Sequence, residues 1–428
     1  HEENALQIDW QDIIPKDKLN YIIGNPPFLG FSNMTKQQKK DQSLFTTNKI
    51  LDYVACWYYK AAEYIQNTDI QVAFVSTSSI TQGEQVEPLW TDMIEKYNLH
   101  INFCHRSFPW DQESEETILY KERQRELAFT RKQGAQKQGK QQPKKQERTK
   151  KATVYCVIIG FSQTKNDKEK LIFTYIKKPI YNLENNKKYE TIVIKQIANN
   201  INPYLVDAPN IIVKSRKKNL CNVPEMVLGS ILRDGSNFIV TPNEYEEFIK
   251  KEPKAKKFIK KIMGTEELLY NKERYVLWLV DATPQEIQSM KLVQERIEKV
   301  RNFRLKSPRL GTQKLAKFSS LFAEIRQPTT NYLAIPRISS ERREYVPMDY
   351  LPYTTIVTDL LFCIPNCPLY IFSILNSQVH NAWMRAVAGR FGNGYRYSAN
   401  VVYNNFPFPE LTETQKQKLN ELGQNILD

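Results

Sequence analysis

One tetrapeptide in the chain combines residue types that could position an exocyclic amine for chemistry. Asn25-Pro26-Pro27-Phe28 directly follows a short apolar run, residues 20–24, which predicts a buried strand. Such a strand would carry the Asn25 side chain to the carboxyl edge of a sheet, where open α/β sheets bind ligands. Because the prolines have no N–H, the Asn25 side-chain oxygen and the Pro26 carbonyl could accept both hydrogens of an –NH2 group. Phe28 offers a flat face on which an extruded base can stack.

The alternative interpretation is a strand followed by a proline-rich turn, because Asn-Pro is ordinary turn chemistry. The order of all four residues directly after an apolar run favours the functional interpretation. The tetrapeptide resembles motif IV of methyltransferases that use S-adenosylmethionine and act on amino groups. Within that group, Asn at the first position, here Asn25, is typical of adenine-N6 chemistry, whereas cytosine-N4 enzymes more often carry Ser.

The elements that would position this tetrapeptide lie in residues 1–180. Apolar residues at helical spacing predict a helix over residues 51–65 and another over 88–97. Alternating or β-branched runs predict further strands over residues 71–77, 99–104 and 152–161. Strands that alternate with helices predict an α/β fold, here a partial doubly wound, Rossmann-like sheet.

The pattern changes after residue 180. Lysine-rich helical stretches, short apolar runs and frequent turn residues predict an α+β domain over residues 181–375. The longest of these stretches predict helices over residues 244–263, 284–304 and 369–388, the last reaching into a helical segment over 376–428. The glycine cluster at 389–394 predicts a loop, because a nucleotide-binding loop would follow a strand and open a helix.

Charge is concentrated in one segment. The net charge of the chain is +14, and residues 121–151 contain twelve Lys or Arg against three Asp or Glu. This segment has no hydrophobic periodicity, so residues 112–150 or so are expected to form a mobile basic insertion. It is either a solvated insertion without a specific role or a sequence-independent contact to nucleic-acid phosphates.

Several function classes are disfavoured by the composition. No apolar run approaches the roughly 18 residues that span a membrane. The six cysteines are scattered, and Cys363 and Cys367 lack the second Cys or His pair of a zinc site. His100, His105 and His380 have no metal-ligand spacing, so no metal site is assigned. Unpaired thiols are typical of a reducing compartment, and a cytoplasmic location is expected.

Taken together, the motifs resemble the C-terminal two-thirds of a class I adenine-N6 DNA methyltransferase, and more narrowly the MmeI-like fusion restriction–modification enzymes. The resemblance covers nearly the whole chain apart from the basic insertion. It implies an α/β methyltransferase domain over residues 1–180, a target-recognition domain over 181–375 and a C-terminal helical segment. The stretches that carry it are residues 4–10 (motif III), 25–30 (motif IV), 76–85 (motif VI), 108–110 (motif VIII), 339–347 (specificity region), and 395–398 with 403–409 (C-terminal signature).

The resemblance also exposes a missing part. Methyltransferases of this class hold S-adenosylmethionine with a Gly-rich turn after a first strand and an acidic residue after a second, and neither precedes Asn4. The cofactor pocket is therefore expected to be incomplete in this chain, which would begin inside the catalytic domain. A nuclease domain that binds Mg²⁺ would be found upstream, if the parent protein has one.

The resemblance assigns roles to several residues. Asn25 and the Pro26 carbonyl would accept the N6 hydrogens of a flipped adenine, and Phe28 would stack on it. Phe108 and Trp110 are candidates for the second face of the base pocket, with core packing as the alternative. Asp9 would approach the cofactor through motif III, with helix capping or a surface position as the alternative.

A mixed polar region over residues 326–345 is the candidate DNA reader. Arg suits guanine, Gln or Asn suits adenine, and Glu suits the cytosine amine, so a mixed set favours base readout over phosphate contact. A salt-bridged surface is the alternative. The candidate residues are Arg326, Gln327, Arg337, Ser339, Ser340, Arg342, Arg343 and Glu344.

These features predict a site-specific adenine-N6 DNA methyltransferase, acting as a monomer on double-stranded DNA within a restriction–modification system. One alternative is a methyltransferase with the same tetrapeptide that acts on RNA or on a protein glutamine. The other is a DNA-binding specificity module whose catalysis needs another chain. Binding of S-adenosylmethionine and of duplex DNA, measured side by side, discriminates among them.

Overall fold

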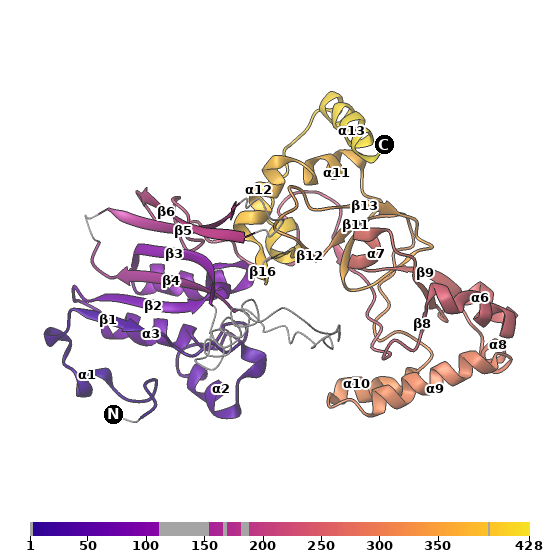
Figure 1. The fold of residues 1–428 in the computed structure, drawn as a ribbon, viewed down its shortest axis with the longest axis horizontal. Helices are drawn as coiled ribbons and strands as arrows, with labels where there is room; N and C mark the ends of the chain where they lie inside the picture. Colours follow the sequence, from indigo (N-terminus) through magenta and orange to yellow (C-terminus); the bar gives the residue numbers. More distant parts are fainter. Residues whose placement is uncertain (1–2, 111–153, 166–168, 181–187, 393) are drawn as a thin grey trace, which may run out of the picture. The chain divides into compact units, whose positions relative to one another are not determined.

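The computed structural model describes residues 3–110, 154–165, 169–180, 188–392 and 394–428 (Figure 1). The chain forms two compact units, one of residues 1–81 and 88–212 and one of residues 82–87 and 213–428. The first unit extends past residue 180, because strand β6 (Lys188–Ala198) pairs along its whole length with β5 (Lys170–Ile180). The predicted basic insertion lies outside the described residues.

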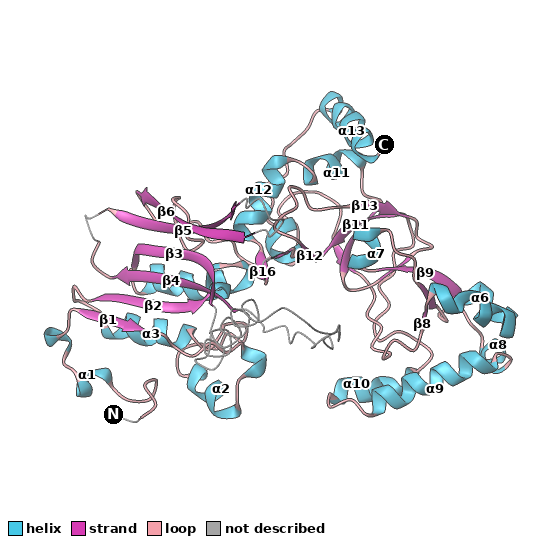
Figure 2. Ribbon diagram, in the orientation of Figure 1, coloured by secondary structure: helices cyan, strands magenta, loops and turns pink. Residues whose placement is uncertain are grey.

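A mixed six-stranded sheet forms the centre of the first unit (Figure 2), with the strand order β1-β2-β4-β3-β5-β6. The pairs β1–β2 and β3–β5 are parallel, whereas β4 and β6 run antiparallel to their neighbours. The predicted α/β class is confirmed. The other strands are β1 (Tyr21–Gly24), β2 (Gln71–Thr77), β3 (His100–Trp110) and β4 (Val154–Ser162). The prediction that the strand before Asn25 is buried was wrong: β1 lies at the edge of the described sheet, and Tyr21 and Ile23 are 64% and 82% exposed.

Helix α3 (Ala55–Tyr64) packs on this sheet through Tyr58. The Tyr58 ring stacks on Phe161 of β4 at 5.4 Å between centroids, and its hydroxyl lies 2.8 Å from Ser76 Oγ of β2. Alternate residues of β2 are buried, as expected for a strand with one covered face. The other helical segments of this part of the chain are α1 (Trp10–Ile13), η1 (Lys16–Lys18), η2 (Phe31–Asn33), α2 (Lys36–Ser43), η3 (Ser78–Thr81), η4 (Gly83–Gln85), α4 (Val86–Thr91) and the π-helix η5 (Asp92–Lys96).

The second unit contains three small sheets, with strand orders β14-β9-β10-β8, β13-β11-β15-β7 and β12-β17-β16. Its largest described core packs aromatic residues such as Phe238 and Trp278 against helix α9. The strands are β7 (Val227–Leu228), β8 (Ile239–Val240), β9 (Ile259–Met263), β10 (Tyr275–Leu277), β11 (Tyr332–Pro336), β12 (Ile338–Ser339), β13 (Asp349–Leu351), β14 (Ile356–Val357), β15 (Leu361–Pro365), β16 (Gly389–Phe391) and β17 (Gly394–Arg396). The helices are α6 (Pro242–Lys251), η6 (Pro253–Phe258), α7 (Thr265–Tyr270), α8 (Pro284–Gln288), α9 (Lys291–Leu305), α10 (Leu310–Lys314), η7 (Leu315–Phe318), α11 (Leu369–Leu375), α12 (Gln378–Val387), η8 (Ala399–Tyr403) and α13 (Glu413–Leu427).

Three of the long helices predicted from periodicity are broken in the structure. The 244–263 stretch ends as a helix at Lys251, because Pro253 follows, and continues as a short 3-10 helix and strand β9. The 284–304 stretch divides into α8 and α9. The 369–388 stretch divides into α11 and α12, because the Ser377 side chain accepts a hydrogen bond from His380 N–H and starts a new helix.

The glycine cluster at 389–394 forms part of a β-hairpin rather than a simple loop. Strands β16 and β17 pair antiparallel around a turn in which Gly392 has φ +58°. A positive φ of this size suits glycine, so the cluster serves the hairpin turn. The prediction of a loop was wrong, but the context still differs from that of a nucleotide-binding turn.

Candidate functional site

The Asn25-Pro26-Pro27-Phe28 segment leaves β1 at the carboxyl edge of the first sheet. Gly24, the last residue of β1, pairs in parallel register with β2, so both strands end at this edge. Pro26 is buried, Phe28 is half-buried, and Asn25 and Pro27 are exposed. Over the described ranges the Asn25 side chain makes no hydrogen bond, so its amide oxygen is open to a ligand.

Asp52 links the segment that follows β1 to the end of β2. Its Oδ2 accepts a hydrogen bond from Thr77 Oγ1 at 3.0 Å and another from Ser79 Oγ. The other oxygen, Oδ1, faces Gly30, where a Cβ would lie 3.7 Å away. The small hydroxyl residues after β2 therefore help to fix a carboxylate beside the proline segment.

Asp41 of α2 connects three segments near the proline segment through hydrogen bonds to its carboxylate. Its buried carboxylate accepts four hydrogen bonds of 2.9–3.0 Å, from Asn4 Nδ2, Gln7 Nε2, Gln37 Nε2 and Tyr53 Oη. Burial alone would raise the pKa of Asp41, but these hydrogen bonds hold the pKa below its usual value. Tyr53 N–H also donates to the Leu29 carbonyl at 2.8 Å, which connects Asp41 to the end of the proline segment.

Sequence reasoning missed Asp41, because it lies in the polar stretch Lys36–Ser43 with no motif around it. The residues that it binds do carry a signal. Asn4 and Gln7 belong to the stretch that resembles motif III, and both donate to the Asp41 carboxylate.

Phe108 and Trp110 lie on β3, whose carboxyl end is at the same edge of the sheet as Asn25. The strand β3 is antiparallel to β4, which is antiparallel to β2, so β3 runs in the same direction as β1 and β2. Both side chains are half-buried, and the Phe108 ring lies 5.1 Å from the Tyr175 ring and 6.3 Å from that of Trp110. Two strands separate β3 from β1. The fold thus brings these aromatics to the predicted edge, in contact with β5.

Asp9 occupies a helix N-cap. Its side chain accepts a hydrogen bond from Gln11 N–H at 2.9 Å at the start of α1. The carboxylate is exposed. The capping alternative raised from the sequence therefore describes its position, and one carboxylate oxygen remains for any further contact.

Three of the candidate readers in the second unit bind other groups of the protein, and a fourth, Ser339, is buried without a hydrogen-bond partner for its Oγ among the described residues. The Gln327 amide donates to the carbonyls of Tyr353 and Thr355 at 3.0 and 2.8 Å and accepts from Val357 N–H at 2.9 Å. Arg337 donates to the Asp359 carbonyl at 2.8 Å, Arg326 pairs with Glu324, and Ser339 is buried on β12. These side chains fix the shape of the region.

The other four candidates are carried by one turn, residues 340–344. Ser340, Arg342 and Glu344 are exposed and Arg343 is half-buried. Ser340 Oγ accepts a hydrogen bond from Arg342 N–H at 3.2 Å, which stabilises the turn. No ion pair or side-chain hydrogen bond of Arg342, Arg343 or Glu344 occurs within the described residues. The charged ends of the turn are therefore available to a ligand.

Arg385 of α12 anchors this turn. Its Nη2 donates to the Arg343 and Glu344 carbonyls, both at 2.9 Å, and its guanidinium lies 5.7 Å from the Tyr395 ring. Sequence reasoning missed Arg385. The available signal was a basic residue near the end of a helix that also carries buried residues.

The predicted C-terminal signature packs against the strand-poor segment 213–224. Tyr403 Oη donates to the Pro224 carbonyl at 2.7 Å, and Asn404 Nδ2 donates to the Arg216 carbonyl at 2.8 Å. Asn405 Nδ2 donates to the Lys214 carbonyl at 3.0 Å. The signature residues Tyr397, Tyr403, Phe406 and Phe408 are buried, so this motif is structural in the second unit.

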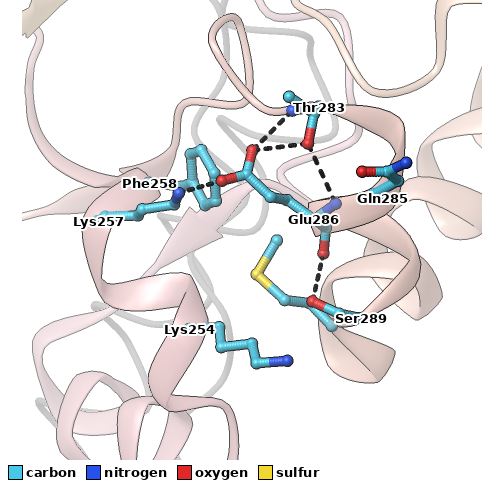
Figure 3. Close-up of a pocket in the computed structure, with 8 residues that line it drawn as sticks. Lys254, Lys257, Phe258, Thr283, Gln285, Glu286 and Ser289 are labelled. Atoms are coloured by element: carbon cyan, nitrogen blue, oxygen red, sulfur yellow. Dashed lines mark hydrogen bonds and ion pairs between the residues drawn. The ribbon is translucent and has the colours of Figure 1, made fainter.

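A surface pocket of about 630 Å³ lies between η6 and α8 (Figure 3). Lys257 and Thr283 hold the Glu286 carboxylate, and the Thr283–Glu286 contacts form a capping box that starts α8. The Lys257 hydrogen bond, assisted by Thr283, lowers the pKa of Glu286 to about 2. Lys257 and Glu286 therefore form an ion pair with each other, and we assign the pocket no catalytic role.

Metal-ligand groups and membrane-spanning helices are both lacking in the described residues. Within the described ranges, no group of three or more His, Cys, Asp or Glu side chains could hold a metal ion. All six cysteines are free thiols, five of them buried. No helix in the described part of the chain is long and apolar enough to cross a membrane.

Comparison with known proteins places these sites in a family. Residues 1–119 match the model of the MmeI DNA-methyltransferase domain, and residues 207–410 match that of the MmeI target recognition domain. "DNA methyltransferase A" of Bacillus subtilis (strain 168) is 34% identical over 431 residues, covering 99% of this chain and 43% of that protein. The structure of the Type IIL restriction-modification enzyme MmeI in complex with DNA is 39% identical, with a TM-score of 0.84, and covers 100% of this chain and 51% of that one. The chain thus spans about half the length of these relatives.

Proposed function

We propose a function from one premise, that the chain belongs to the MmeI-like family of proteins with a DNA-methyltransferase domain and a target recognition domain. The proposed reaction is the transfer of a methyl group from S-adenosylmethionine to N6 of a flipped adenine in duplex DNA. The observation that carries the proposal is the open Asn25 amide, in a proline segment at the carboxyl end of β1.

The residues of this segment would act by positioning. The Asn25 Oδ1 and the Pro26 carbonyl would accept the two N6 hydrogens, which turns the nitrogen lone pair out of conjugation with the ring. Phe28 would stack on the base, and Phe108 and Trp110 would bound the pocket at the same edge of the sheet. When bound, S-adenosylmethionine would supply an electrophilic methyl group to N6, and one N6 proton would be released to solvent. Alignment of the reacting atoms supplies much of the rate.

The cofactor site is only partly represented by the described residues. Asp9 and Asp52 are the nearest candidates for contacts to it, but both carboxylates already accept hydrogen bonds within the protein. No glycine-rich turn leads from a described strand of the first sheet into a helix. The described residues therefore do not by themselves fit the whole cofactor. Its use is proposed from the methyltransferase family, with methyl donation as its chemistry.

Target recognition is proposed for the turn at residues 340–344. Its exposed Arg342 and Glu344 side chains, with Arg343 and Ser340, would read base edges, whereas Arg326, Gln327, Arg337 and Ser339 would hold the turn in shape. A restriction–modification role, a monomeric state and a cytoplasmic location complete the proposal. The relative solved in complex with DNA supports DNA as the partner.

The decisive experiment compares an Asn25→Ala variant with the unaltered protein, both expressed from the full reading frame so that any cofactor-binding residues outside this chain are present. Both are incubated with unmethylated duplex DNA and labelled S-adenosylmethionine, and the DNA is digested for nucleoside analysis by mass spectrometry. We expect N6-methyladenine with the unaltered full-length protein and a loss of at least about 100-fold with the variant, because the amine is no longer oriented. DNA affinity should be unchanged in the variant.

The other outcomes discriminate the alternatives. Methyl transfer that survives Asn25→Ala, or that yields another methylated base, would exclude the proposed site chemistry. Transfer to RNA or to a protein glutamine, with none to duplex DNA, would favour the second enzyme class. Salt-sensitive DNA binding without cofactor binding, measured by calorimetric titration, would favour a DNA-binding specificity module.

A further inference from the structure

A second charged surface, distinct from the reading turn, lies on the second unit. Residues 299–323 contain seven Lys or Arg and no Asp or Glu. They include the second half of α9, the short helix α10 and the 3-10 helix η7, and α9 and α10 lie side by side in Figure 1. An uninterrupted run of one sign on folded elements is an electrostatic footprint for a polyanion.

Within the described residues, five of these charges have no counter-ion: Lys299 in α9, and four more that follow α9 or lie in the next two elements. Lys306, Arg309, Lys314 and Lys317 are exposed and make no ion pair within the described residues. We call these four side chains, with Leu310 and Phe318 between them, the α10 surface. Arg301 is excluded because Glu298 lies 3.7 Å from it.

The lysine-rich face around β9 differs in this respect. There, Lys251, Lys257 and Lys261 pair with Glu247, Glu286 and Glu273. The remaining lysines of that face, including Lys250, Lys254 and Lys256, are exposed. That face therefore has a mixed charge, whereas the α10 surface is purely basic.

A buried arginine holds the α10 surface in one shape. Arg304 is 0% exposed, and its guanidinium donates to five backbone carbonyls over 2.7–3.2 Å. Three acceptors, Leu315, Phe318 and Leu321, belong to the segment that follows α10. These three contacts fix the segment after α10 against α9, and the other two, to Leu232 and Arg233, hold α9 itself, so little conformational entropy would be lost when a ligand binds.

Large apolar side chains are exposed between the charges. Leu310 is 73% exposed and Phe318 is 60% exposed. Proteins that bind the minor groove of DNA place such side chains against the sugars and base steps while basic groups contact the phosphates. The combination of free cations, exposed apolar tips and a fixed backbone is thus suited to a nucleic-acid groove.

We propose that the α10 surface binds the sugar–phosphate backbone of duplex DNA without regard to sequence, and so orients DNA for the reading turn. This inference rests on the proposed function, because it takes duplex DNA as the partner. Positive charge without any acidic residue over 25 positions favours a dense polyanion over an acidic protein patch, which would present fewer charges. The short length of α10, five residues, is unlike the long amphipathic helix that lies on a membrane surface.

The test uses the 428-residue chain and a K306Q/R309Q/K314Q variant. None of these three side chains makes a hydrogen bond within the described part of the structure, so glutamine should leave the fold intact. Affinity for a fluorescent random-sequence duplex is measured by anisotropy over a series of KCl concentrations. We expect the slope of log affinity against log salt to fall by about 3, because each phosphate contact contributes about 0.9. The loss should be the same for every duplex sequence.

A K250Q/K254Q/K256Q variant is the matched control, since it removes three charges from another exposed face of the same unit. Its slope should change by less than about 1. Equal slopes for both variants, or an unchanged slope in the α10 variant, would overturn the inference and leave the proposed function standing. Failure of the unaltered chain to bind any duplex would overturn the proposed function and the inference together.

Two further measurements separate the partner classes. An L310S/F318S variant should bind DNA about three- to tenfold more weakly with an unchanged salt slope, because it removes apolar contact rather than charge. Vesicles of phosphatidylcholine with phosphatidylglycerol should bind none of the proteins. Vesicle binding that disappears in the K306Q/R309Q/K314Q variant, while DNA binding is retained, would overturn the inference in favour of a membrane.

Discussion

At the scale of single residues, two buried polar groups differ in their protonation state: one is a charged carboxylate and the other a neutral imidazole. Asp41 is a charge supported by four donors, whereas His380 is a neutral ring supported by one partner, the Tyr397 hydroxyl at 2.8 Å from Nε2. Each group is almost fully buried, so changing it should alter stability through its protonation state or its hydrogen bonds.

The Asp41→Asn variant tests the carboxylate as a structural centre. An amide presents one oxygen and an NH2 group, so at least one of the four donors would face another donor. We expect a loss of about 2 kcal/mol in the free energy of unfolding, because hydrogen bonds to a charged acceptor are lost inside the protein. Urea unfolding measures the loss, and Gln37→Ala, which removes a single donor, should cost less.

His380 predicts a pH dependence. Burial lowers its pKa to about 3, whereas the unfolded chain binds a proton near the usual value of 6.5. As the pH falls from about 8 to about 5, the unfolded state gains protons that the folded state does not. Stability should therefore fall, by up to about 2 kcal/mol from this residue. In His380→Gln this part of the pH dependence should be absent, and identical urea-unfolding profiles for the two proteins would contradict the assignment.

At the scale of elements, close backbone contacts decide which glycines could be replaced by a residue with a side chain. Gly229 follows β7, where the chain crosses the residues that follow β14: a Cβ on Gly229 would lie 2.2 Å from the Thr358 carbonyl oxygen. Gly311 lies in α10, where a Cβ would meet no atom within 4 Å. The same substitution should therefore have opposite effects at these two positions.

Alanine variants at these glycines test the packing of the second unit. We expect Gly229→Ala to lower the free energy of unfolding by about 2 kcal/mol or more, because backbone must move. Gly311→Ala should raise it by up to about 1 kcal/mol, because alanine favours the helix. Thermal unfolding of both variants measures the two changes in stability. Changes of the same sign and size would contradict the close approach of Gly229 to the Thr358 carbonyl oxygen.

At the scale of the whole molecule, the chain divides its tasks between two compact units. The first carries the open Asn25 amide, and the second carries the reading turn and the α10 surface. The predicted basic insertion lies in the sequence between Trp110 and Val154, which are paired neighbours on β3 and β4. The ends of the insertion are thus close enough for a short turn to join them.

Replacement of residues 112–152 by a short Gly/Ser linker tests the role of the insertion. The sheet register at Trp110 and Val154 should persist, so the melting temperature should not fall, because loop shortening costs little entropy. If the insertion binds several phosphates, the slope of log DNA affinity against log salt should decrease by about 0.9 for each contact that is lost. An unchanged slope would identify the insertion as a solvated segment without this role.

The sequence alone was sufficient for the features that depend on local order. The strand before Asn25, the α/β class and the family resemblance follow from hydrophobic periodicity and from motifs of a few neighbouring residues. Capping of α1 by Asp9 was also foreseen as an alternative, because an N-cap is a contact between near neighbours.

Tertiary structure decided whatever depends on partners far apart in the chain. Whether Gln327 reads DNA or supports the backbone near Thr355 depends on strands that the sequence cannot pair in advance. The roles of Asp41 and Arg385 depend on partners that include residues 34 to 42 positions away in the chain, Asn4 and Gln7 for Asp41 and Arg343 and Glu344 for Arg385. Periodicity likewise merged α11 with α12, since a capping serine competes with a continuous apolar face only in three dimensions. Local chemistry fixes which elements form, and long-range contacts fix which side chains remain open to a ligand.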